Sequence, residues 1–302
     1  MLRKLRLEPS KLKILGFLNT RMGLSEDEKQ NYLYLKKGYD GEVMFDSLTN
    51  KLQCECYILN DLLLTINNTF FQIDTLIIFQ NKVNFFEVKN YEGDFFYEKE
   101  KLYTKSRFEI KDPILQVKRS ESLLRQFFQS HGFHNIPIEG MVVFINPEFT
   151  LYQAPINEPI IFPTQLPRYL KKLDMTPSKL NGLHKKLADK LISLHIDESP
   201  HTTLPQYDYQ QLQKGFTCKV CHSFLISVKG NKCVCDLCKH QEVVESAVLR
   251  SVGEFKLLFP DRKVTTNEIY EWCRVIGSKK RISRILGRNF KSVGAHKSTF
   301  YE

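Results

Sequence analysis

The stretch that decides the fold is Phe71-Gln-Ile-Asp74-Thr-Leu-Ile-Ile78, followed after a short turn by Phe85-Phe-Glu87-Val-Lys89-Asn90-Tyr91. Both segments are rich in apolar, aromatic and β-branched residues, which predicts two strands. One acid stands at the expected end of the first strand, and an acid and a lysine stand on the second. Apolar packing does not require charged residues there, so we expect them to form a site.

Side-chain alternation predicts how these charges are arranged. Glu87 and Lys89 are two residues apart, so on a strand they point to the same face. A two-residue hairpin at Asn81-Lys82 would place Asp74 opposite Lys89 and next to Glu87. All three side chains are then expected on one face of the sheet.

The chemistry of this set predicts a divalent metal. The carboxylates of Asp74 and Glu87 would repel each other unless a cation lay between them, and carboxylate oxygens suit Mg²⁺ or Mn²⁺. The Lys89 ammonium would hold or deprotonate an attacking water and would balance charge on a phosphorane, while the metal polarises a phosphoryl oxygen. The pattern therefore indicates hydrolysis of phosphodiester bonds.

Asp74 followed thirteen residues later by Glu87-Val-Lys89 resembles the PD-(D/E)xK nuclease motif. The flanking sequence, over roughly residues 30 to 150, resembles the nuclease-related domain known as NERD. Three further pieces are similar to motifs of that domain: Gly38-Tyr-Asp-Gly41-Glu42, Asn90-Tyr91-Glu-Gly93 and Asp112-Pro113-Ile-Leu-Gln116.

The resemblance implies a restriction-endonuclease-like α/β fold, a mixed sheet flanked by helices. It also implies that Glu42 supports the metal and that Gln116 contacts the water or the substrate. Each feature alone has a simpler explanation, because Glu-x-Lys on a strand is ordinarily a weak surface ion pair. Glu42 alone would be an exposed helix residue, and Gln116 alone would follow a helix start at Pro113.

The net charge of +10 on 302 residues is unevenly distributed, and most of the basic excess lies in residues 246–302. Such a module suggests a polyanionic partner, and nucleic acid fits better than a membrane because no lipid-facing apolar stripe accompanies it. The alternative is a generic solubilising surface. The residues expected to contact nucleic acid are Lys279, Lys280, Arg281, Arg284, Arg288, Lys291 and Lys297.

Paired cysteines give the second strong signal. Cys218-Lys-Val-Cys221 and Cys235-Asp-Leu-Cys238 supply four thiolates in two knuckles, which predicts a zinc ribbon with a structural Zn²⁺. Cys233 is an alternative to Cys235, but only Cys235 preserves the second two-residue spacing. A redox dithiol is the chemical alternative, although redox CxxC motifs usually occur singly.

The remaining pattern predicts the order of elements. Ser25-Glu-Asp-Glu28 is a capping box that opens a helix, and a second helical stretch is expected around Glu42. Strands are expected over residues 57–105, with a turn at Asn67-Asn68. We then expect a helix after Pro113, a strand over 140–145 and an amphipathic helix over 183–194. The side chains of the helix after Pro113 that are expected in the protein core are Leu115, Leu123, Leu124, Phe127 and Phe128.

The last segment resembles a helix-turn-helix with a wing. Helices are expected over 246–259 and 266–272, and Ser278 is expected to cap a third that is basic. The predicted division is an N-terminal helical extension (1–29), a nuclease-like domain (30–195), a linker (196–215), a zinc ribbon (216–245) and a winged-helix-like module (246–302).

No apolar run is long enough to span a bilayer, and the start lacks the features of a signal peptide, so a cytoplasmic protein is expected. The sequence thus predicts a metal-dependent nuclease acting on DNA. The competing hypothesis is a DNA-binding scaffold or adaptor that keeps the nuclease fold without turnover. The sequence does not distinguish DNA from RNA and identifies no protein partner.

Overall fold

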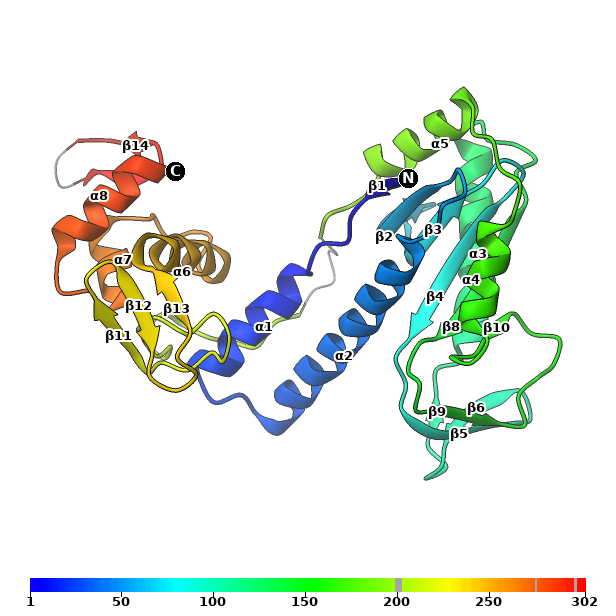
Figure 1. Ribbon diagram of the computed structural model, residues 1–302, viewed down its shortest axis with the longest axis horizontal. Helices are drawn as coiled ribbons and strands as arrows, with labels where there is room; N and C mark the ends of the chain where they lie inside the picture. Colours follow the sequence, from blue (N-terminus) through cyan, green and yellow to red (C-terminus); the bar gives the residue numbers. More distant parts are fainter. Residues whose placement is uncertain (199–202, 275, 296–297) are drawn as a thin grey trace. The chain divides into compact units, whose positions relative to one another are not determined.

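The computed structural model describes residues 1–198, 203–274, 276–295 and 298–302. The chain forms two compact units, one made of Met1–Glu8 with Leu33–Thr202 and one made of Pro9–Tyr32 with Thr203–Glu302 (Figure 1). Each unit has its own apolar core. Within the described residues, no helix is long and apolar enough to cross a membrane.

The main sheet of the first unit is mixed, as predicted. Strands β2, β3 and β4 are antiparallel neighbours, and β1, β8 and β10 add parallel pairs. The strand order is β1 (Leu2–Lys4), β2 (Tyr57–Ile66), β3 (Thr69–Ile78), β4 (Val83–Lys89), β8 (Ile138–Phe144) and β10 (Ile160–Ile161).

Two tight turns set the register of the central strands. Asn67 and Asn68 join β2 to β3 with φ of 48° and 59°, left-handed values that asparagine tolerates, and this turn was predicted. The predicted turn at Asn81-Lys82 is wrong by one residue: the Phe79 amide donates to the Lys82 carbonyl at 2.9 Å, so the turn residues are Gln80 and Asn81. The shift moves the pairing by two positions and therefore leaves every side chain on its predicted face.

One face of the sheet is covered by α2 (Glu26–Thr49) and α4 (Leu166–Asp174). Helix α2 is continuous, whereas two helical stretches were predicted, and Ser25 and Glu28 make the expected reciprocal cap at 2.9 and 3.3 Å. Helix α4 was not predicted. Phe45 of α2 and Leu166 and Leu173 of α4 pack on this face against strand residues that include Ile77, Phe86 and Val88.

The opposite face carries α3 (Pro113–Ser130) and α5 (Gly182–Ser193). Leu124, Phe127 and Phe128 are buried as predicted, but Leu115 is 61% exposed and is not a core residue. A second sheet packs beside this core in the order β7 (Glu109–Ile110), β6 (Lys101–Thr104), β5 (Gly93–Glu98) and β9 (Phe149–Tyr152).

The second unit combines helices with two small antiparallel sheets. Its elements are α1 (Ser10–Arg21), β11 (Ile226–Lys229), β12 (Lys232–Cys235), β13 (Gln241–Val243), α6 (Val244–Leu258), α7 (Thr266–Cys273), α8 (Lys279–Asn289), β14 (Ser292–Val293) and β15 (Phe300–Tyr301). Arg21 of α1 and Glu254 of α6 form a buried ion pair at 2.6 Å. Tyr209 and Leu212, within the segment expected to be a linker, are buried in this core.

Candidate active site

Three of the residues singled out in the sequence line one cavity of about 380 Å³. Asp74 comes from the interior of β3, rather than from its end, Glu87 from β4, and Gln116 from the first turn of α3. Lys111, Asp112, Leu115, Arg119 and Ser120 complete the wall formed by α3 and the residues before it. The cavity therefore lies where β3 and β4 face the start of α3.

Asp74 is held by the strand next to it. Its side chain is buried, and Oδ2 accepts a hydrogen bond from the Val88 amide at 2.8 Å. Burial raises the pKa of Asp74 well above its ordinary value, and the charges of Glu87 and Glu42 raise it further. Burial and the nearby acids disfavour the ionised form of Asp74, so a cation in the cavity would stabilise this carboxylate strongly.

Lys89 lies beside the cavity and contacts Glu87. The Lys89 Nζ atom is 2.7 Å from Glu87 Oε1, and both side chains are largely buried. Burial lowers the pKa of Lys89, but the adjacent Glu87 carboxylate outweighs it, and the net pKa is raised. Lys89 therefore presents an ammonium group, not a neutral amine.

The start of α3 is built to place Gln116. Asp112 caps the helix by accepting from the Ile114 amide at 2.8 Å, and Pro113 occupies the first turn, where a missing N–H costs nothing. The hydroxyl of Tyr97 donates to the second oxygen of Asp112 and ties the cap to β5. A rigid cap fixes the side chains one turn later.

Glu42 is placed differently from the other site residues. It projects from α2 and does not line the cavity; its Oε2 accepts from Arg6 Nη1 at 2.5 Å. Arg6 also donates to Asp46 at 2.9 Å and to the Asp74 carbonyl at 2.6 Å. Burial raises the pKa of Glu42 to about 7 even though Arg6 opposes the shift. Sequence reasoning missed Arg6, because no local pattern marks it.

Two exposed cations at the cavity were also missed. Lys111 precedes the cap of α3 and Arg119 lies one turn beyond Gln116. Neither side chain has a hydrogen-bond or ion-pair partner among the described residues. The two residues stand on either side of the motif Asp112-Pro113-Ile-Leu-Gln116. For Arg119, the available signal was its position three residues after Gln116, which puts both side chains on one side of a helix.

Residues 37–145 match the family model described as the nuclease-related domain. This part of the chain is a NERD domain. The matched stretch contains Glu42, Asp74, Glu87, Lys89 and Gln116. No curated protein and no solved structure matches the chain.

Outside the NERD domain, four cysteines form a compact cluster. The sulfur atoms of Cys218, Cys221, Cys235 and Cys238 all lie within 4.8 Å of one another, with Cys218 to Cys238 and Cys221 to Cys235 each at 3.5 Å. Four thiolates about 2.3 Å from a tetrahedral zinc lie roughly 3.8 Å apart, so the cluster suits a structural zinc ion. In the part of the chain that the structure describes, the acids of the NERD domain form no comparable group of three.

Cys235, not Cys233, belongs to the cluster, as the spacing predicted. Cys233 lies on β12 two residues before Cys235, and its side chain is buried in the core of the second unit. Burial raises the pKa of the Cys233 thiol to about 11. The four clustered thiolates leave no open coordination position, which does not suit the redox alternative.

The predicted nucleic-acid residues lie on and after α8. Lys279, Lys280, Arg284 and Arg288 are exposed on α8, opposite a buried apolar face. Arg281 instead donates to Gly230 and Asn231 of the β11–β12 turn, both at 2.8 Å. Lys291 is exposed beyond the helix, and Lys297 lies outside the described residues.

Proposed function

We propose that the NERD domain is a metal-dependent nuclease that hydrolyses phosphodiester bonds of DNA. The observation that carries the proposal is the convergence of Asp74, Glu87 and Gln116 on one cavity with Lys89 in contact with Glu87. These residues come from β3, β4 and α3. Burying charged side chains costs free energy, so buried charges brought together from separate elements are typical of a functional site. The arrangement is consistent with a PD-(D/E)xK-like nuclease fold.

Asp74 and Glu87 would hold Mg²⁺ or Mn²⁺, since one or two carboxylates with several waters are the usual protein contribution to such a site. The bound ion would polarise a phosphoryl oxygen and lower the pKa of a bound water. The Lys89 ammonium would position the attacking water and balance the charge on the phosphorane. The Gln116 amide would orient the water or the scissile phosphate.

Lys111 and Arg119 would bind the phosphates that neighbour the scissile one. Both are free cations on the cavity wall formed by the start of α3. They would neutralise phosphate charge on either side of the scissile bond. Such contacts fix the register of the strand without reading its sequence.

The second unit would hold the nucleic acid. Helices α7 and α8 with the β14–β15 pair suit a winged-helix-like module, whose recognition helix would be α8. Lys280, Arg284 and Arg288 lie exposed on that helix. The zinc ribbon would be structural, because the Arg281 contacts to Gly230 and Asn231 tie α8 to the ribbon turn.

A second candidate function is a DNA-binding scaffold without turnover. It is favoured by the ion pair between Arg6 and Glu42, which already neutralises the acid expected to support the metal. A scaffold would bind DNA with an affinity that falls with salt and would show no metal-dependent cleavage.

Cleavage of supercoiled, linear and single-stranded DNA by the zinc-loaded protein tests the proposal. Cleavage is expected with added Mg²⁺ or Mn²⁺ and not without them, and Lys89→Ala should abolish it while DNA binding is kept. Lys82→Ala is the matched control, because Lys82 also pairs with a glutamate, Glu139 at 2.6 Å, but lies outside the cavity. Wild-type cleavage by Lys89→Ala, or binding without cleavage under every metal condition, would refute the nuclease mechanism.

A further inference from the structure

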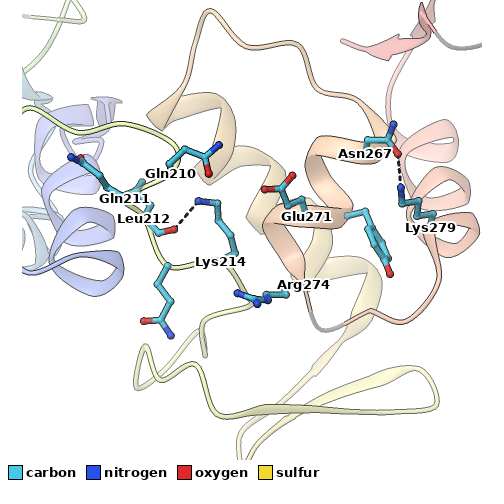
Figure 2. A pocket seen from close by; sticks show the side chains of 10 residues that line it. Gln210, Gln211, Leu212, Lys214, Asn267, Glu271, Arg274 and Lys279 are labelled. Carbon is cyan, nitrogen blue, oxygen red and sulfur yellow. Dashed lines mark hydrogen bonds between the residues drawn. The ribbon is translucent and has the colours of Figure 1, made fainter.

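The second unit contains a larger cavity, of about 820 Å³, that the proposed nuclease mechanism does not use. It is formed by the segment before the zinc ribbon, by α7 and by the first residue of α8. A volume of this size is within the range that holds nucleotide-sized ligands. Figure 2 shows the side chains that reach into it.

The charges of the cavity favour an anion. Among the described residues that line it, Lys214, Arg274 and Lys279 supply positive charge, and Glu271 supplies the carboxylate. Lys214 donates to the Leu212 carbonyl at 2.7 Å, and Lys279 donates to Asn267 Oδ1 at 3.0 Å. Lys214 also donates to the Tyr209 carbonyl, so all three acceptors are neutral and cancel no charge. Glu271 attracts Lys214, and the cavity as a whole keeps a positive excess, with three cations against one carboxylate.

Arg274 is the free group of the set. Its guanidinium has no hydrogen-bond or ion-pair partner among the described residues, and its backbone adopts a φ of 52° at the end of α7. A positive φ is uncommon for arginine. In Figure 2, Lys214, Glu271 and Arg274 lie together in the middle of the view, and Lys279 lies apart from them beside Asn267.

The cavity also offers groups for a base. Tyr270 lines it, with Lys279 Nζ at 5.3 Å from the ring centroid. An aromatic ring stacks on any base, and the Asn267 amide can hydrogen-bond to a base edge. Cations beside an aromatic ring are the combination that a phosphate joined to a nucleoside requires.

We infer that this cavity binds a nucleoside phosphate monoester, with the phosphate on Arg274 and Lys214 and the base near Tyr270. A monoester carries about two negative charges at neutral pH, which matches the cationic excess of the cavity better than the single charge of a diester. The ligand is either the phosphorylated end of a nucleic-acid strand or a free nucleotide. The strand-end form rests on the proposed function, because it assumes that the protein acts on nucleic acid.

The test is equilibrium binding to the full-length, zinc-loaded protein with no added Mg²⁺ or Mn²⁺, so that cleavage does not intervene. The probes are single-stranded oligonucleotides of one sequence with a 5′-phosphate, a 3′-phosphate or hydroxyl ends, together with 5′-AMP and adenosine. We expect a phosphorylated end to bind about tenfold tighter than the hydroxyl form, and 5′-AMP, but not adenosine, to displace it. If 5′-AMP alone binds as tightly as the phosphorylated strand, the ligand is a free nucleotide; if it binds more weakly, the ligand is a strand end.

Two variants locate the effect. Arg274→Gly removes the guanidinium at a position whose backbone suits glycine, and it should abolish the preference for phosphate. Arg288→Gln removes an exposed charge of α8 outside the cavity, and it should weaken all strands equally. Equal binding of phosphorylated and hydroxyl strands, or a preference kept in folded Arg274→Gly, would overturn the inference. A phosphate preference in this assay, combined with no cleavage in the separate assay with Mg²⁺ or Mn²⁺, would instead refute only the nuclease.

Discussion

Arg6 and Glu42 are joined by a hydrogen-bonded ion pair at 2.5 Å, and they lie 36 residues apart in the chain. The Arg6 side chain is 3% exposed and also contacts Asp46 and the Asp74 carbonyl. The N-terminal segment thus reaches the strand that carries the central acid of the cavity. We therefore expect Arg6 to stabilise the fold.

Arg6→Gln should lower the free energy of unfolding by about 3–5 kcal/mol, because it leaves Glu42 and Asp46 buried without their counter-ion. Arg3→Gln is the control on the same segment. Arg3 pairs with Asp189 at a more exposed site, so its loss should cost less than about 1 kcal/mol. Urea unfolding of both variants measures the difference, and equal costs would show that the Arg6 network is not stabilising.

Gly41→Ala should destabilise the NERD domain by about 1–3 kcal/mol. A Cβ built at Gly41 would lie 2.5 Å from Asn90 Cβ, so α2 and the end of β4 would have to move apart. Gly38→Ala, on the same helix with nothing within 4 Å of its added Cβ, should instead stabilise by roughly 0.5–1 kcal/mol. Opposite shifts in thermal unfolding are expected, and a neutral Gly41→Ala would disprove the close contact.

Cys221→Ser should remove zinc and unfold the β11–β13 ribbon, since structural zinc contributes folding free energy directly. Cys233→Ala should keep the metal, because Cys233 faces the apolar core. Zinc content by atomic spectroscopy, together with limited proteolysis, checks both variants. Zinc loss in folded Cys233→Ala would mean that the ligand set is different.

Arg119→Gln should weaken DNA binding similarly for all sequences and reduce the slope of log affinity against log salt by about 1, as expected for one lost phosphate contact. Arg125→Gln is the control on the same helix; Arg125 pairs with Glu121 and does not line the cavity. Binding isotherms at several salt concentrations distinguish the two. An unchanged slope for Arg119→Gln would remove this residue from the substrate path.

Stability should fall on acidification through His195. Its Nδ1 accepts from the Leu63 amide at 3.1 Å, and burial, followed by the charge of Lys4, lowers its pKa below 6.5; Asp61 and Asp197 act in the opposite direction. The unfolded chain therefore takes up this proton at higher pH than the folded protein does. The stabilisation is complete above about pH 7 and declines as pH falls through 6.5 toward the lower folded pKa.

The free energy of unfolding at pH 7.5 and 5.5 measures this effect. His195→Gln should reduce the difference between the two values, whereas His134→Gln, at an exposed position, should leave it unchanged. If both variants keep the wild-type pH dependence, His195 does not couple to folding.

Local signals predicted many of the elements. The Ser25 and Glu28 cap, the Asn67-Asn68 turn, the start of α3 at Pro113 and the choice of Cys235 over Cys233 all depend on residues close together in the chain. The shared face of Asp74 and Glu87 was also predictable, because alternation survives a two-residue change of register. The exact hairpin turn, the continuity of α2 and the existence of α4 were not.

The sequence by itself determined which residues we propose to carry the chemistry: the acids and lysine of β3 and β4, the four zinc-type cysteines and the basic α8. Their types and short spacings are sufficient, since the strand period and the CxxC knuckle act over a few residues. Only the tertiary structure decided that Arg6 neutralises Glu42, that Lys111 and Arg119 flank the cavity, and that Arg274 shares a second cavity with Lys214. Those relationships join segments far apart in the chain, and they arise from packing that no local pattern encodes.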